Sequence, residues 1–325
     1  MDKLFQAAEK LLCYFISIKR DEVLWAISDL PENEPGRKAI AKVASDLRLS
    51  INWINLPRMT RNGQELPLDT SSSIPGGQAV LAYTSLSLSS TSFRQQICSG
   101  NGRFFSLPGG GQALDLLAVN QSDMDIMKRR GKLIKEALEK AKSIQLIWQD
   151  ANLNIPLYKR KARLDLGACR SPGCFGSPSF EVNIVPAEYE TQGSMFVLAA
   201  LPEIEIFNNP IKLIAHQGKI NNAFENKIGR HHVNLQKFVE NAEMSMLRIG
   251  ELGFGLNHRI SFPADSYMAN ESIWGTVHIG IGRNLTLGGS FNASSHIDLV
   301  MRPEQVYFDV VPIDQIINNI PLINK

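Results

Sequence analysis

Four side chains of the kinds that bind metal ions lie within fifty positions of one another near the C-terminus: Glu251, His278, His296 and Asp298. His296 and Asp298 are two residues apart, and a strand directs residues at that spacing to the same face of a sheet. Carboxylate and imidazole groups together suit a divalent ion such as zinc, cobalt or manganese. The spacing therefore predicts a metal site with oxygen and nitrogen ligands.

The segments that carry these residues alternate in the manner of β-strands. Residues 277–281 and 295–300 each place their histidine on one face, and Glu251 opens a third strand-like segment. A glycine-rich loop, residues 282–289, joins the first two, and glycine suits places where the backbone must approach another group closely. We expect the strands to bring the four ligands together.

The rest of the sequence indicates two kinds of domain. Residues 2–18 predict an amphipathic helix, 23–27 a buried strand, 36–47 a helix and 50–54 a second strand, an order typical of a parallel α/β unit. From residue 143 onward, short apolar or alternating runs are separated by Gly, Pro and Asn, with one clear helix at 233–249. We predict an α/β domain over 1–142, with helices around a parallel sheet, followed by a β-rich α+β metal-binding domain over 143–325.

Residues 124–142 predict a long basic helix that includes Arg129 and Arg130. The acidic Glu136 and Glu139 lie among its basic residues, so a solvated helix face is favoured over a binding patch. Cys169 and Cys174 are five residues apart with no second pair, which does not indicate a zinc knuckle.

Composition narrows the class of protein. The chain has 325 residues, 44% hydrophobic and 20% charged, with a formal net charge of +2. A near-neutral charge gives no reason to expect nucleic acid or an anionic membrane as partner. Residues 1–10 lack the order of a signal peptide, and no apolar run approaches the ~20 residues that span a bilayer. These features predict a cytoplasmic protein.

Three segments, residues 251–257, 275–282 and 294–298, resemble the signature segments of the aminopeptidase T family of thermophilic, leucyl aminopeptidase-like metalloaminopeptidases. The resemblance is clearest over residues 180–300. It implies a homodimer that cleaves the N-terminal bond of a peptide or small amide. It also implies two divalent ions (zinc, cobalt or manganese) held by Glu188, Glu251, His278, His296 and Asp298. The motif before Glu188 is degenerate, and Glu190 is the rival.

The resemblance also suggests catalytic roles. Glu251 or Glu188 could act as general base, and Arg283 in the glycine-rich loop could contact the substrate. His258 and Arg259 could bind a substrate carboxylate or be a solvated pair in a loop. The family tyrosine that lies seven residues after the first histidine is replaced by Leu285, which cannot donate a hydrogen bond.

Three alternatives stay open at this point. The same superfamily is similar to Fe(II) ring-cleaving dioxygenases of dihydroxypyridines, and His278, His296 and Asp298 could form a facial triad for one iron. The relatives use a histidine where this chain has Glu251, which favours the peptidases. The loss of the tyrosine to Leu285 motivates a second alternative, a tailoring hydrolase or cyclase of a biosynthetic pathway. The third is a degenerate binding protein with weak metal uptake.

Overall fold

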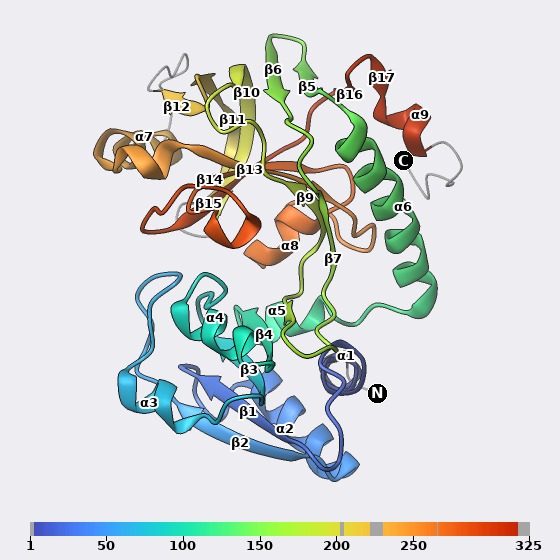
Figure 1. Cartoon of the computed structure of the whole chain (residues 1–325), viewed down its shortest axis with the longest axis vertical. Coiled ribbons are helices and arrows are strands. Elements are labelled where there is room, and N and C mark those ends of the chain that lie inside the picture. Colours follow the sequence, from blue (N-terminus) through green and yellow to red (C-terminus); the bar gives the residue numbers. More distant parts are fainter. Residues whose placement is uncertain (1–2, 202–204, 222–229, 265, 318–325) are drawn as a thin grey trace. The chain divides into compact units, whose positions relative to one another are not determined.

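The computed structural model describes residues 3–201, 205–221, 230–264 and 266–317. The chain forms two compact units (Figure 1). Unit 1 comprises residues 1–121, 165–179 and 265–269, and unit 2 comprises residues 122–164, 180–264 and 270–325. The sequence predicted one boundary at residue 142, whereas the chain leaves unit 1 at residue 121 and later returns to it. Within the described ranges, no helix is long and apolar enough to cross a membrane.

Unit 1 is built on a parallel sheet with strand order β2-β1-β3-β4-β8. Its strands are β1 (Val23–Ser28), β2 (Ser50–Asn55), β3 (Ala79–Thr84), β4 (Arg103–Pro108) and β8 (Phe175–Gly176). Its helices are α1 (Lys3–Lys10), α2 (Pro35–Leu47), α3 (Leu68–Ser73), α4 (Ser92–Ser99) and α5 (Gly111–Asp115), and a π-helical turn follows α1 at Leu11–Phe15. The parallel sheet with helices agrees with the predicted α/β part.

Local sequence explains where α2 begins and ends. The Glu34 side chain caps its first turn by accepting a hydrogen bond from the Arg37 backbone N–H, at 2.7 Å. Pro35 follows at the first helical position, where its missing N–H is not needed. Arg48 ends the helix in the left-handed conformation, with φ of 56°. Helix α2 therefore forms the crossover connection between the parallel strands β1 and β2.

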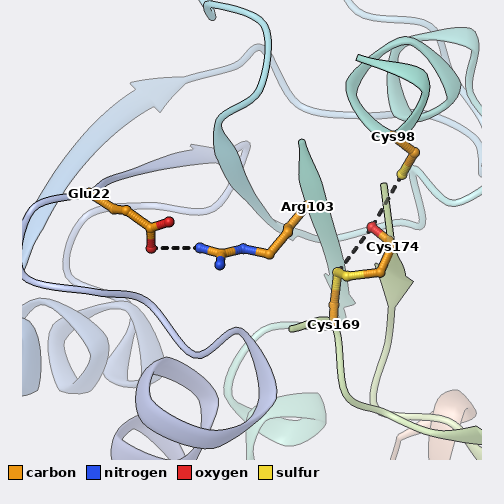
Figure 2. The surroundings of a disulfide bond; sticks show 5 residues. All are labelled: Glu22, Cys98, Arg103, Cys169 and Cys174. Carbon is orange, nitrogen blue, oxygen red and sulfur yellow. Dashed lines mark hydrogen bonds and ion pairs between the residues drawn. A yellow bond between two sulfur atoms is a disulfide. The ribbon is translucent and has the colours of Figure 1, made fainter. Parts of the chain in front are cut away.

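A disulfide joins Cys169 to Cys174 in the segment that returns to unit 1 (Figure 2). The spacing of these two cysteines in the sequence bears on metal binding and does not predict the bond. The free thiol of Cys98 on α4 contacts the Cys174 carbonyl at 3.3 Å, and Arg103 on β4 pairs with Glu22 at 2.8 Å. Cys174 precedes β8, so the disulfide closes a short loop beside the edge strand of the parallel sheet.

Unit 2 is built on a large sheet with the order β17-β16-β5-β6-β10-β15-β14-β13-β9-β7, in which β11 joins β10 and β12 joins β11. Its pairings from β17 to β9 are antiparallel. The strands are β5 (Ser143–Trp148), β6 (Ala151–Pro156), β7 (Arg163–Leu166), β9 (Phe180–Ile184), β10 (Gln192–Leu201), β11 (Glu205–His216), β12 (Lys219–Asn221), β13 (Ile249–Gly255), β14 (Val277–Gly282), β15 (His296–Met301), β16 (Gln305–Phe308) and β17 (Val311–Pro312). This sheet agrees with the predicted β-rich part.

The helices of unit 2 differ from the prediction at two places. They are α6 (Gln121–Lys140), α7 (Arg230–Asn241), α8 (Tyr267–Ser272) and α9 (Ile313–Ile317). The helix expected at 233–249 ends at Asn241 instead, and a 3-10 turn at Met244–Leu247 leads into β13. The basic helix α6 is not solvated all along its charged positions, because Arg130 is fully buried. The next residue, Gly131, lets α6 pack closely against Leu164, because a Cβ at Gly131 would lie 2.3 Å from the Leu164 side chain.

Candidate metal centre

Four adjacent strands of unit 2 place acidic and histidine side chains on one face of the sheet. Glu181 comes from β9, Glu251 from β13, His278 from β14, and His296 with Asp298 from β15. Glu251 lies opposite Gly280, which in turn lies opposite Asp298. Positions two apart on a strand share a face, so the same face of the sheet carries all five side chains. The structure places Glu251 near His278 in one group of side chains and near His296 and Asp298 in another, and their role as metal ligands stays a prediction.

Two glycines make room for the cluster. A Cβ on Gly253 of β13 would lie 1.9 Å from Nε2 of His278. A Cβ on Gly280 of β14 would lie 2.5 Å from Cε1 of His296 and 2.7 Å from Cβ of Glu251. Only a residue without a side chain can occupy either position without moving the histidines.

The five side chains form two groups that could each hold a metal ion. The first contains Glu181, Glu251 and His278, and the second contains Glu251, His296 and Asp298. In each group the ligand atoms lie within 4.8 Å of one another. Nε2 of His278 lies 3.2 Å from Glu181, and Nε2 of His296 lies 3.0 Å from Glu251 and 3.2 Å from Asp298. Glu251 belongs to both groups.

Neighbouring polar groups hold two of these side chains in place. Nδ1 of His296 contacts the backbone carbonyl of Arg283 at 2.8 Å, which leaves Nε2 directed at the carboxylates. Asn183, two residues further along β9, donates a hydrogen bond to the other oxygen of Glu181 at 2.8 Å. Both contacts orient a potential ligand, and each leaves the atom that points into the cluster free to bind a metal ion.

The electrostatics of the cluster fit a cation. Burial lowers the pKa of His278, but the hydrogen bond and charge of Glu181, aided by Asp298 and Glu251, raise it to about 9. Burial likewise lowers the pKa of His296, and the charge and hydrogen bond of Asp298 raise it well above its usual value. The imidazoles therefore take up protons to offset the buried carboxylates, a task that a divalent ion would perform in their place.

A further acid, Glu271 at the end of α8, adjoins the cluster. Burial raises its pKa well above the usual value, and the charges of Asp298 and Glu181 raise it further. A hydrogen bond links it to Asp298, whose pKa is lowered chiefly by His296 against the effect of burial. Burial and the neighbouring carboxylates therefore both favour the neutral form of Glu271 over its charged form. A single acid in a short helix carries no periodic signal, so the sequence alone does not predict its position.

Glu188, the expected first glutamate of the site, lies in neither group of potential ligands among the described residues. Its carboxylate accepts hydrogen bonds from the Ser290 backbone at 2.7 Å and from Asn284 at 3.1 Å, and it pairs with Arg160 at 3.0 Å. Glu181 instead lies in the first group, with Glu251 and His278. The signal that could have found Glu181 is the alternation of Glu181 and Asn183 with apolar residues along β9.

Other expected site residues have different surroundings. The Arg283 side chain contacts Asn292 at 2.7 Å, and its backbone rather than its guanidinium contacts the cluster. His258 and Arg259 both approach Asp123 of α6, at 3.2 and 3.6 Å. Leu285 begins a 3-10 turn at Leu285–Leu287 and is partly exposed. None of these side chains reaches the five-residue cluster by a contact described in the structure.

Comparisons with known proteins reveal the fold but not a family. No family model and no curated protein matches the sequence. Among solved structures, a 2,5-dihydroxypyridine dioxygenase from Pseudomonas putida KT2440 is similar, with a TM-score of 0.75, 19% identity and 96% of each chain covered. AmpT from Thermus thermophilus is similar with a TM-score of 0.63, 12% identity and 94% of each chain covered. At these identities the two likenesses show the fold of this chain alone.

Proposed function

We propose that this protein is a metal-dependent hydrolase of the aminopeptidase type, which cleaves an N-terminal peptide or amide bond. The observation that carries the proposal is the position of Glu251, shared by two groups of potential ligands. A carboxylate can bridge two ions with its two oxygens, so this geometry suits a pair of divalent ions. The fold of AmpT supports the same class of enzyme.

The residues present fit such a pair of ions. Glu181 and His278 would hold one ion, His296 and Asp298 the other, and Glu251 would contribute to both. Glu181 replaces Glu188 in the ligand set that the sequence suggested. Each ion would have two carboxylate ligands and one imidazole. Such a ligand set suits zinc, cobalt and manganese alike and does not distinguish among them.

Two divalent ions would supply a water of lowered pKa and would polarise the carbonyl of the bond to be cleaved. The chain itself provides the means of moving a proton. Glu271 has a raised pKa, chiefly because it is buried, and is hydrogen-bonded to Asp298, so it would be placed to hold and return a proton beside the cluster. Leu285 offers no proton, and Arg283 is engaged with Asn292. Proton transfer therefore rests on the acidic side chains.

Metal analysis tests the proposal. The protein is purified without chelator beside a His296→Ala variant, and both are analysed for their elements. We expect about two zinc, cobalt or manganese ions per chain, fewer in the variant, together with hydrolysis of aminoacyl chromogenic substrates. Absence of metal in both proteins after reloading would refute the proposal. Metal at full stoichiometry without turnover of any aminoacyl substrate would instead favour the specialised tailoring hydrolase.

A ring-cleaving dioxygenase is the second candidate, and the high structural similarity to the Pseudomonas enzyme favours it. A facial triad requires two histidines and one carboxylate on one ion. The group around Asp298 supplies one histidine and two carboxylates, and His278 belongs to the other group. One iron per chain and uptake of oxygen with a dihydroxypyridine substrate would establish this alternative over the hydrolase.

A further inference from the structure

Arg130, in the middle of α6, has a buried guanidinium that lacks an acceptor. Its exposed fraction is 1%, and its Cζ atom lies 4.0 Å from the centre of the Trp274 ring. None of its three side-chain nitrogens has a hydrogen-bond partner among the described residues. A buried guanidinium stays protonated, and leaving it without an acceptor is strongly unfavourable. The side chain is therefore placed to meet an acceptor that the described part of the chain does not provide.

The surrounding charges do not neutralise Arg130. The carboxylate of Asp123 is used by His258, at 3.2 Å, and by Arg259, at 3.6 Å. Burial and then the charge of Arg130 lower the pKa of His258, so that its ring is neutral at pH 7. Burial also accounts for the lowered pKa of Arg130, with no opposing influence from a described carboxylate. The Asp123 carboxylate thus has contacts with His258 and Arg259, and no described contact places a carboxylate against Arg130.

A second unpartnered donor lies next to Trp274. The Trp274 backbone N–H donates to the carbonyl of Asn257 at 2.9 Å, so the two residues are neighbours across adjoining segments. Oδ1 of Asn257 accepts from the Arg259 backbone at 2.9 Å, whereas its Nδ2 has no partner within the described ranges. Both unpartnered groups donate hydrogen bonds, which is the pattern expected around an anion.

We infer that Arg130 and Asn257 form a binding site for a small carboxylate. A guanidinium that stacks on an aromatic ring directs its N–H groups outward in its own plane. Two of these N–H groups match the two oxygens of a carboxylate. The burial of Arg130 restricts the ligand to a small anion of the size of formate or acetate. Because the site uses none of the five metal-centre residues, it does not depend on the proposed hydrolase activity.

Thermal unfolding in matched salts tests the site. The melting temperature of the wild type is measured against increasing sodium formate and sodium acetate, with sodium chloride keeping the ionic strength constant. We expect a saturable rise with the carboxylates, because a ligand that binds only the folded state stabilises it. An equal rise in chloride alone would identify a halide as the ligand and overturn the carboxylate. If the melting temperature depends on none of the anions, the proposed site is refuted, because ordered water would then be enough to satisfy the Arg130 donors.

Neighbouring arginines supply a matched pair of variants. Arg130→Met should weaken formate binding by about tenfold or more, the usual effect of losing charge-assisted hydrogen bonds. Arg129→Met, one residue earlier on the exposed face of α6, should leave binding unchanged. An equal response of Arg130→Met and wild type would refute the site. Should that variant fail to fold, crystals of the wild type soaked in formate must show the anion at the Arg130 nitrogens, and water alone there would refute it.

Discussion

At the scale of single residues, Glu181 lies where the sequence suggested that Glu188 would lie. Both are acids ahead of β13, and the degenerate motif pointed to Glu188. In the structure Glu181 lies 3.2 Å from His278, whereas Glu188 is held by Arg160, Asn284 and Ser290. One acid is therefore a candidate ligand, and the other fixes the loop that begins at Arg283.

Removing the charge of each glutamate separates these roles. We expect Glu181→Gln to lower the metal content of the purified protein, because an amide is a much weaker ligand than a carboxylate. Glu188→Gln should keep the metal content and lower the melting temperature, because it loses an ion pair with Arg160. Elemental analysis and thermal unfolding of both variants check this. The reverse pattern would restore Glu188 as the ligand.

Glu188 also makes stability depend on pH. Burial raises the pKa of this carboxyl, but the hydrogen bonds of Ser290 and Asn284 and the charge of Arg160 lower it more, so the net pKa is below its usual value. Its stabilisation is therefore fully present above the unfolded pKa of about 4.3 and is lost as the pH falls through the lower folded pKa. We expect the difference in unfolding free energy between wild type and Glu188→Gln to shrink between about pH 5 and pH 3. Urea titrations at several pH values measure it, and a constant difference would contradict this assignment.

At the scale of elements, glycines on β13 and β14 determine whether β14 and β15 can carry their histidines. Gly253 lies directly opposite His278 in the register, and Gly280 lies between Glu251 and Asp298. The candidate centre therefore depends on the absence of side chains as much as on the ligands. A strand pair with alanine at these positions would keep its hydrogen bonds and lose the space for the imidazoles.

Gly253→Ala tests this dependence. Its Cβ would lie 1.9 Å from Nε2 of His278, so the ring must move, and we expect loss of metal together with about 1–3 kcal/mol of stability. Gly76→Ala is a suitable control, because no atom lies within 4 Å of its added Cβ. Metal content and chemical unfolding of both variants decide the matter. Full metal binding by Gly253→Ala would mean that His278 is not a ligand.

The sequence predicts those parts of the fold in which apolar residues recur with a regular spacing. The strands at β1, β2, β14 and β15 and the helix α2 lie where apolar runs and alternation place them. The end of α7 was not predictable, since residues after Asn241 keep helical composition but turn into β13. The meeting of Glu181 with His278 and the burial of Arg130 depend on strands and helices distant in sequence, which a local pattern does not encode.

At the scale of the whole molecule, the candidate centre lies within one unit, so the binding of metal should stabilise the units unequally. Binding to the folded state alone raises its stability, and removal of metal would leave buried carboxylates facing one another. We expect a chelator to speed hydrogen exchange in β13, β14 and β15 and to leave β1, β3 and β4 nearly unchanged. Mass spectrometry of exchanged peptides measures this, with His296→Ala as the variant insensitive to chelator. A uniform response across both units would contradict the localisation of metal to unit 2.

The path of the chain through the two units has a consequence for how such a protein can change during evolution. The chain passes between the units five times, because unit 1 takes residues 1–121, 165–179 and 265–269. Neither unit is one continuous stretch of sequence, so a single recombination junction cannot exchange one unit for that of a relative. The parallel sheet and the candidate metal centre are therefore inherited together, and new specificities must arise by substitution within the chain.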